Sequence, residues 1–404
     1  MKVPEKYQFI VELGRALHIY GIPSYKIQTY LTEVAETKGI TGSFMDLPTW
    51  VNYVFYEDEN SYNYIESIPP GVLNLGAFSR IDELTNKVID SKIDNSEINN
   101  ELSIIHSKTK EVNHGFLTFS YAFAAGSFSL LIGTNWVSFG VSLFLGALIY
   151  LLVYLATKSR YLENIFESFS ALIATIISCL LTLVFPELNL GLTILASIII
   201  FIPGLAITTA LEEITSKSLV SGGAKLFDAI ILLFKQFFGV LLGLGLMTSM
   251  IEIDLTQHVS EVPKWTMFFA IPLLSITLIP IFQVRKKDIF FGILTGALAF
   301  FITVLLSGYG VLVSTFIGTL AIVGISRLFG RITKTPKTIY LTQGIIMLVP
   351  GSKSFMGLSN SFLNSSITGS VNFYEQVAFI LMGIIGGLLF AGTFRERRPK
   401  KTGI

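Results

Sequence analysis

Apolar residues run almost without interruption through residues 116–394, whereas residues 1–115 mix apolar and polar positions. A transmembrane helix needs about 20 apolar residues, because the hydrocarbon core is about 30 Å thick. Ten runs are suitable: 116–134, 136–155, 165–185, 190–210, 227–250, 265–282, 289–306, 309–329, 338–358 and 373–394. The pattern therefore predicts ten transmembrane helices.

Residues 1–115 have the periodicity of a soluble α+β domain. Four stripes of apolar residues recur at helical spacing, and residues 43–56 are rich in aromatic and β-branched residues, which favours a strand. Pro48 restricts the start of that strand to an edge or a bend. The four stripes are Ile10, Leu13 and Leu17; Ile27, Leu31 and Val34; Ile81, Leu84 and Val88; and Ile98, Leu102 and Ile105.

Charge is also divided between these two regions. Residues 1–115 hold 16 of the 28 acidic residues and 10 of the 29 Lys and Arg. We therefore predict a small cytoplasmic α+β domain at 1–115, membrane repeats at 116–250 and 265–394, and a basic cytoplasmic tail at 395–404. The expected fold class is an α-helical polytopic membrane protein with ten transmembrane helices in two inverted five-helix repeats.

The composition supports lipid as the solvent for much of the chain. Hydrophobic residues make up 51% and charged residues 14%, against about 25% charged residues in soluble domains. The net charge of +1 gives no indication of a nucleic-acid partner, and the single cysteine, Cys179, excludes an intrachain disulfide. No cleavable signal peptide is visible. The separated histidines, His18, His106 and His114, are interpreted as surface or packed residues, and no metal or cofactor is expected.

Basic residues predict the orientation of the spans. If residue 1 is cytoplasmic, eighteen Lys and Arg fall in the inner connections and the C-terminus, against Lys264 and Lys353 on the outer side. Inner loops carry an excess of Lys and Arg. We therefore expect an integral protein of the plasma (inner) membrane with both termini in the cytoplasm.

An internal repeat relates the two predicted halves. Pro203-Gly204 recurs 147 residues later as Pro350-Gly351, each after a run of apolar residues. At the same offset Ser221-Gly222 matches Thr368-Gly369 and Phe227-Asp228 matches Tyr374-Glu375. Five spans per unit place the second unit in the opposite orientation, an arrangement typical of secondary transporters. The alternative is a structural duplication without transport.

The repeated Pro-Gly pairs lie about 12 or 13 residues into their spans, near mid-membrane. Proline removes a backbone donor and glycine tolerates unusual dihedrals, so each pair predicts a broken helix. Freed carbonyls at that depth must face protein or a water-filled cavity, and the amides of the new helix favour an anion such as a carboxylate. A simple proline kink is the alternative for each break.

Polar residues follow both breaks. Ser352, Lys353 and Ser354 follow the second, and Thr208 and Thr209 follow the first one turn later. A lysine at the centre of a span costs about 2.5–3.5 kcal/mol on insertion scales. We predict that Lys353 binds a solute carboxylate and that the hydroxyls bind its other polar groups. Alternatively, the helix ends at Gly351 and Lys353 is an outer-loop charge.

Candidate proton carriers lie in the last span of each half. Asp228 and its repeat partner Glu375 are near predicted span ends, and Lys235 lies two turns after Asp228. A carboxylate at the rim of a low-dielectric cavity can titrate near neutral pH. Capping of a helix N-terminus is the competing interpretation for both acids. Two glycine pairs with small-xxx-small spacing are interpreted as helix-packing positions: Gly239 with Gly243, and Gly292 with Gly296.

The motifs together resemble the threonine/serine exporter family, which includes fungal pheromone-regulated membrane proteins. The resemblance rests on Gly14–Pro23, Leu47-Pro48, Gly71–Leu84, Ile202-Pro203-Gly204 with Ser221-Gly222, and Val349-Pro350-Gly351-Ser352. It implies a cytoplasmic first domain, ten spans, and proton-driven export of threonine and serine. Some relatives are associated with dicarboxylate export.

These patterns leave several functions open. The leading hypothesis is a transporter, not an enzyme, that moves a small amino acid through a lipid bilayer by proton antiport; a dicarboxylate or other small organic acid is an alternative. A hydrolase in which Lys353 activates Ser352 or Ser354 belongs to another class, but the sequence has no orienting third group or nucleophile elbow. A regulatory scaffold needs fewer spans. The sequence is compatible with a homo-oligomer.

Overall fold

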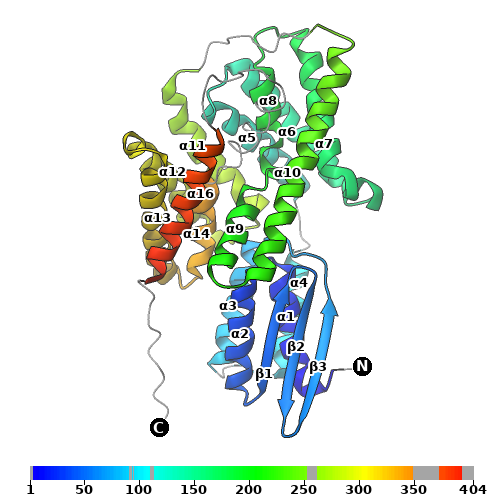
Figure 1. Cartoon of the computed structure of the whole chain (residues 1–404), viewed down its shortest axis with the longest axis vertical. Coiled ribbons are helices and arrows are strands. Elements are labelled where there is room, and N and C mark those ends of the chain that lie inside the picture. Colours follow the sequence, from blue (N-terminus) through cyan, green and yellow to red (C-terminus); the bar gives the residue numbers. More distant parts are fainter. Residues whose placement is uncertain are drawn as a thin grey trace.

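The computed structural model describes residues 3–90, 93, 95–109, 113–252, 262–348 and 373–393. An N-terminal unit (residues 3–109) lies at one end of a larger helical unit (residues 113–393), as Figure 1 shows.

The N-terminal unit packs four helices against a three-stranded antiparallel sheet in the order β1-β2-β3. Its elements are α1 (Glu5–Ile19), α2 (Ser24–Thr37), β1 (Thr41–Leu47), β2 (Trp50–Glu57), β3 (Asn60–Ser67), α3 (Leu75–Ile89) and α4 (Asn95–Thr109). The four predicted helical stripes correspond to α1, α2, α3 and α4, and every residue of these stripes is buried. Amphipathic periodicity therefore located all four helices.

Residues 43–56 form β-structure as predicted, but they belong to two strands and not to one. Leu47 pairs with Trp50, so Pro48 and Thr49 form the turn of a hairpin between β1 and β2. Proline has no N–H to donate to a sheet ladder, which explains why the chain reverses at this position.

The described part of the helical unit contains eleven α-helices and four 3₁₀ turns. They are α5 (His114–Leu131), α6 (Trp136–Ala156), α7 (Arg160–Thr182), α8 (Leu190–Ile198), η1 (Ile199–Phe201), α9 (Gly204–Thr215), α10 (Leu219–Thr248), η2 (Lys264–Thr266), α11 (Met267–Ile281), η3 (Lys286–Asp288), α12 (Ile289–Leu305), η4 (Ser307–Tyr309), α13 (Val311–Thr333), α14 (Lys337–Leu348) and α16 (Phe373–Thr393).

Six of the described helices are long and apolar enough to cross a membrane, or seven spans if a bent pair is one of them. The six are α6, α7, α10, α12, α13 and α16, and the bent pair joins 190–201 to 204–215. The 15-residue α11 is apolar but shorter, and α5 has 18 residues at the position of the predicted first span. The structure therefore shows a polytopic helical protein, with fewer qualifying spans among the described residues than the ten predicted.

Several long helices of the helical unit pack closely in pairs. In the first half α7 runs along α10, and in the second α13 runs along α16. Glycines allow close approach of α10 to α7 and of α12 to α14. A Cβ on Gly239 of α10 would lie 2.2 Å from the Ser168 carbonyl of α7, and one on Gly292 of α12 would lie 2.0 Å from the Gln343 side chain of α14. The interpretation of these glycines as packing positions is confirmed.

Candidate functional site

The helix of the predicted fourth span is interrupted near its middle. Helix α8 ends at Ile198, the turn η1 follows, and α9 starts at Gly204 after a bend of 49°. Pro203 precedes α9 directly, and because proline cannot donate a backbone hydrogen bond, α8 cannot continue through it. The predicted break at Pro203-Gly204 is confirmed.

A side chain of another helix satisfies one carbonyl that this break exposes. Gln236 of α10 donates from Nε2 to the Phe201 carbonyl oxygen at 2.6 Å, and the residue is 1% exposed. Its Oε1 atom has no hydrogen-bond partner among the described residues. The sequence analysis gave Gln236 no role, although an amide within an apolar span was a usable signal.

A cavity of about 520 Å³ opens beside the break, between the two halves of the helical unit. Its walls are mostly apolar, with hydroxyls from Thr303, Ser307, Ser314 and Thr315. Gly204 and Leu205, the first two residues of α9, form part of the lining. Further walls come from α5, α11, α12, α13, α14 and α16, so helices from both halves enclose the space.

The four substrate-binding residues predicted in the first half differ in whether they line this cavity. Gly204 lines it, and Pro203 is buried at the break. The hydroxyls of Thr208 and Thr209 donate back to the carbonyls of Gly204 and Leu205 within α9, and neither threonine is among the described lining residues. Of these four residues, Gly204 is therefore the one that lines the cavity.

The corresponding residues of the second half lie outside the described residues: Pro350, Gly351, Ser352, Lys353 and Ser354. Helix α14, which covers the first part of the predicted ninth span, ends at Leu348, and Leu348 lines the cavity together with Ile346 and Met347.

The three candidate proton carriers are not in the cavity lining that the structure describes. Asp228 and Glu375 belong to exposed positions of α10 and α16. Lys235 forms an ion pair with Glu167 of α7, with 3.6 Å between Nζ and Oε2. Each remains a prediction.

A buried polar cluster that the sequence does not predict joins the N-terminal unit to the helical unit. Glu213 at the end of α9 is fully buried. It accepts hydrogen bonds from the Ser24 amide at 2.9 Å and the Ser221 hydroxyl at 2.8 Å, and it forms an ion pair with Lys225. Ser24 lies 189 residues before Glu213, so spacing along the sequence gave no signal for this cluster.

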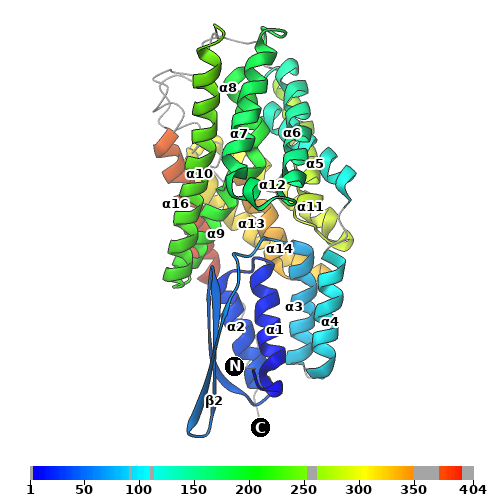
Figure 2. The same cartoon turned by 90° about the vertical axis from the view of Figure 1, so that its right-hand side faces the viewer.

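A second contact joins α3 to the connection between α11 and α12. The Leu75 amide donates to the Phe282 carbonyl, and Asn74 Nδ2 donates to Gln283 Oε1 at 2.8 Å. Figure 2 shows α3 and α4 beside this end of the helical unit. Arg285 Nη1 lies 2.8 Å from Glu83 Oε1, and Lys287 forms an ion pair with the same carboxylate.

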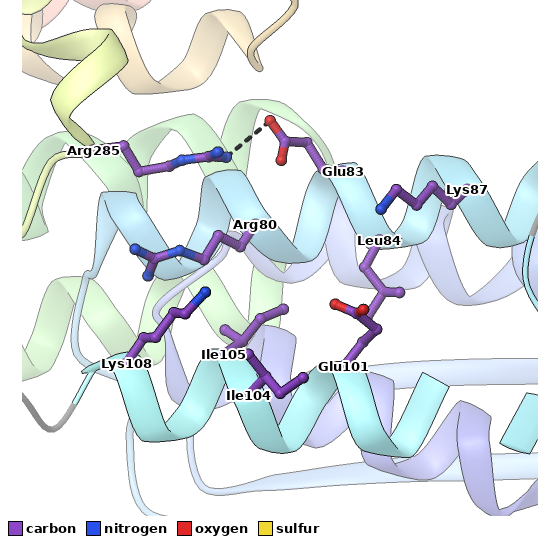
Figure 3. A pocket seen from close by; sticks show the side chains of 9 residues that line it. All are labelled: Arg80, Glu83, Leu84, Lys87, Glu101, Ile104, Ile105, Lys108 and Arg285. Atoms are coloured by element: carbon purple, nitrogen blue, oxygen red, sulfur yellow. Dashed lines mark ion pairs between the residues drawn. The ribbon is translucent and has the colours of Figure 1, made fainter. Parts of the chain in front are cut away.

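A small polar pocket of about 190 Å³ lies beside this contact (Figure 3). Burial opposes ionisation of Glu83, but hydrogen bonds from Lys287 and Arg285 outweigh it and lower the pKa of this carboxyl. Burial and the neighbouring Arg285 lower the pKa of Arg80. Arg80, Lys87, Lys108 and Arg285 provide more positive than negative charge here, since Glu83 and Glu101 are the acidic lining residues.

The described residues contain no group of three His, Cys, Asp or Glu side chains that could hold a metal ion. The sequence predicts that His18 is a surface or packed residue; it is 5% exposed, and its Nδ1 lies 2.6 Å from Asp46 Oδ1.

Comparison with known proteins places these features in a family. The family model described as "Putative threonine/serine exporter" matches residues 8–247, and the model described as "Threonine/Serine exporter, ThrE" matches residues 267–394. No solved structure matches the chain.

The similar curated proteins include fungal membrane proteins. A pheromone-regulated membrane protein 10 from Kluyveromyces lactis is 24% identical over 96% of this chain and 43% of its own length. Proteins of the same name from Eremothecium gossypii and Saccharomyces cerevisiae are 24% and 22% identical, over 91% and 99% of this chain and 51% and 55% of their own lengths. The chain spans about half the length of these relatives. Because the two exporter models together cover both the N-terminal unit and the helical unit, the chain belongs to the threonine/serine exporter family of membrane proteins.

Proposed function

We propose that this protein is a secondary transporter that exports threonine or serine through the cavity between its two helical halves. The observation that carries the proposal is the position of the broken helix: the first turn of α9 lines a cavity that helices of both halves enclose. Family membership supports the substrate class.

The start of α9 provides chemistry for a carboxylate. The first amides of a helix lack intrahelical acceptors, and the helix dipole places partial positive charge there. Gly204 has no side chain, so a ligand atom can approach its backbone closely. We therefore place the amino-acid carboxylate at the amide of Leu205, a lining residue, because the Gly204 amide already donates to the Ile202 carbonyl at 2.7 Å.

The remaining walls suit a small solute with one hydroxyl. The described lining combines many aliphatic side chains with four hydroxyl-bearing residues and holds no charged side chain. A threonine side chain has a methyl group and a hydroxyl, which such a surface matches. Small-molecule sites typically combine apolar walls with a few placed polar groups.

The second half completes the proposed site. Under the 147-residue repeat, Pro350-Gly351 forms a second break opposite the first, with Ser352, Lys353 and Ser354 as further ligands. In this arrangement the halves are inverted five-helix repeats of ten spans, and Lys353 shares the carboxylate. Ile346, Met347 and Leu348 line the cavity at the end of α14, which supports this placement.

Proton antiport and topology complete the proposal. Asp228, Lys235 and Glu375 are candidate coupling residues, and both termini lie in the cytoplasm of a cell whose plasma membrane holds the protein. The basic inner loops support this orientation.

Counterflow of labelled threonine in proteoliposomes tests the proposed function. We expect uptake that excess unlabelled threonine or serine drives and that an imposed pH gradient increases. Absence of counterflow under every gradient would contradict transport of these amino acids, and stimulation by a dicarboxylate alone would reassign the substrate.

A matched pair of variants tests the cavity itself. Thr303 lines the cavity and donates to the Ala299 carbonyl at 2.8 Å, whereas Thr248 makes the same bond to Leu244 away from it. Thr303→Val should lower the apparent affinity for threonine about 5–10-fold, as expected for a lost hydrogen bond of about 1 kcal/mol or slightly more. Thr248→Val should leave it unchanged, and equal effects of both variants would exclude the cavity as the solute site.

A further inference from the structure

Four buried polar side chains form a continuous chain from the N-terminal unit into the helical unit. Asp46 Oδ2 lies 2.6 Å from the Ser24 hydroxyl, which lies 2.6 Å from the Ser221 hydroxyl, which lies 2.8 Å from Glu213 Oε2. All four residues are at most 3% exposed. The chain thus runs from β1 through α2 and α10 to α9, with a carboxyl group at each end.

Counting hydrogens shows that these three oxygen–oxygen contacts need one more hydrogen than the four side chains hold when both carboxyl groups are ionised. Three contacts of this length each require one hydrogen between two oxygens. With Asp46 and Glu213 both ionised, the only hydrogens are the two on the hydroxyls of Ser24 and Ser221. One contact would then bring two oxygen lone pairs to 2.6–2.8 Å without a hydrogen, which is repulsive inside a low-dielectric interior.

We propose that Asp46, Ser24, Ser221 and Glu213 form a proton-binding relay that stores one exchangeable proton. The proton resides on Glu213 when both hydroxyls point toward Asp46, and on Asp46 when both point toward Glu213. Reversal of the two hydroxyls transfers the charge between the carboxyls without breaking a contact. Three hydrogens shift together in this step, from Glu213 to Ser221, from Ser221 to Ser24 and from Ser24 to Asp46. Each hydroxyl oxygen gives up one hydrogen and receives another, while Glu213 loses one and Asp46 gains one.

The charged groups around the relay act on both ends. At the Glu213 end, Lys225 forms an ion pair with Oε1, and the Ser24 amide donates to the same atom. At the Asp46 end, His18 Nδ1 lies 2.6 Å from Oδ1, while His18 Nε2 lies 3.2 Å from the Pro69 carbonyl and must donate to it. The neighbouring titratable groups are Tyr25, which donates to Glu212, Lys26, which donates to Thr338, and Tyr53 near Asp46.

Loss of the stored proton weakens the contact between the two units. The Ser24–Ser221 contact joins α2 to α10, and without a hydrogen the two oxygens repel. Glu213 is the tenth residue of the helix whose first residue, Gly204, lines the cavity. Proton release therefore loosens the end of α9 opposite the cavity, a coupling that rests on the proposed transport function.

Infrared difference spectroscopy on the purified full-length protein tests the relay. A protonated carboxyl has a C=O stretching band that a carboxylate lacks. The side-chain amide of Glu213→Gln can donate to Ser221, and that of Asp46→Asn can donate to Ser24, so each variant supplies the third hydrogen permanently. We expect each single variant to lose the same one protonated-carboxyl band of the unmodified protein.

Glu212→Gln is the matched control, because Glu212 adjoins Glu213 but accepts from Tyr25 outside the relay. This variant should keep the band. Absence of the band from the unmodified protein at every pH would overturn the relay, and so would loss of the band in only one of the two relay variants. If neither relay variant folds, Ser221→Ala provides the same readout, because interruption of the chain also removes the need for a third hydrogen.

A transport measurement separates this inference from the proposed function. In proteoliposomes, Glu213→Gln should retain counterflow of labelled threonine but lose its stimulation by a pH gradient. Unchanged stimulation would overturn the coupling between the relay and transport. Failure of counterflow in the unmodified protein would instead overturn the proposed function and leave the infrared result standing.

Discussion

Among the residues that the structure describes, Gln236 of α10 has one hydrogen-bond partner, the Phe201 carbonyl exposed at the break. Gln236→Leu removes this donor and leaves a carbonyl without a hydrogen bond in an apolar interior, a loss of about 1–3 kcal/mol. We expect a lower unfolding temperature of the detergent-solubilised protein. Phe238→Leu on the same helix is the control, since Phe238 is 60% exposed. Equal stability of Gln236→Leu and the unmodified protein would show that the break needs no external donor.

Some residue-scale features were predictable because they depend on local covalent chemistry. Pro203 breaks its helix wherever the helix lies, so the sequence alone located the break. Glu213 and Ser24 were not predictable, because their roles exist only after two distant segments dock. His18 was interpreted as a surface or packed residue for the same reason: its partner Asp46 lies on a strand of the sheet.

Among the helices, the contact between α7 and α10 depends on Gly239, which has no side chain. A Cβ at Gly239 would lie 2.2 Å from the Ser168 carbonyl, whereas one at Gly245 on the same helix meets nothing within 4 Å. Gly239→Ala should therefore destabilise the protein by about 1–3 kcal/mol through overpacking. Gly245→Ala should be neutral or stabilising by up to about 1 kcal/mol, because alanine favours helix. Thermal unfolding of both variants measures the difference, and a tolerated Gly239→Ala would contradict the observed close packing.

The contact between α3 and the α11–α12 connection depends on pH. The pKa of Glu83 is lowered below the ordinary glutamate value of 4.5, so the folded protein binds fewer protons than the unfolded chain at this group. Its stabilising contribution is complete above about pH 4.5 and decreases as the pH falls through the lower folded-state pKa. Glu83→Gln should therefore reduce the acid sensitivity of the unfolding temperature.

Glu101→Gln is the control for that measurement, because Glu101 lines the same pocket without an ion pair to any residue that the structure describes. The two glutamates lie on adjacent helices, as Figure 3 shows. If both variants change the acid sensitivity equally, the Arg285–Glu83 pair has no specific role.

Element prediction succeeded where hydrophobic periodicity is strong and long. All four N-terminal helices and most predicted spans correspond to described helices. The sheet was harder, because β-strand propensity continues across the turn at Pro48 and because β3 is largely exposed and polar. The apolar segment 190–210 indicated a span, but the division between α8 and α9 came from Pro203 alone.

At the scale of the whole molecule, the predicted orientation can be tested by labelling. Val72 of the N-terminal unit is 78% exposed and Tyr309 between α12 and α13 is 73% exposed. In a Cys179→Ser background, Tyr309→Cys should react with an impermeant maleimide added to intact cells. Val72→Cys should react only after the cells are opened. Labelling of both positions from outside would contradict a cytoplasmic N-terminal unit.

Family and general architecture were predictable from the sequence because composition, repeat spacing and motif order extend over the whole chain. The docking of the two units was not predictable, because its hydrogen bonds join residues more than 180 positions apart, such as Ser24 with Ser221 and Asn74 with Gln283. The cavity was not predictable either, because several helices enclose it together and it forms only when they pack.

Ile339 of α14 is fully buried within the hydrophobic core of the N-terminal unit, and Phe282 and Val284 pack against the same core. This core is therefore incomplete while the ribosome is still synthesising the membrane helices. The N-terminal unit is synthesised before α14 but can reach its final packing only after α14 has been made. Its last folding step follows membrane insertion, so a chain that fails to insert exposes an unfinished apolar surface to cellular quality control.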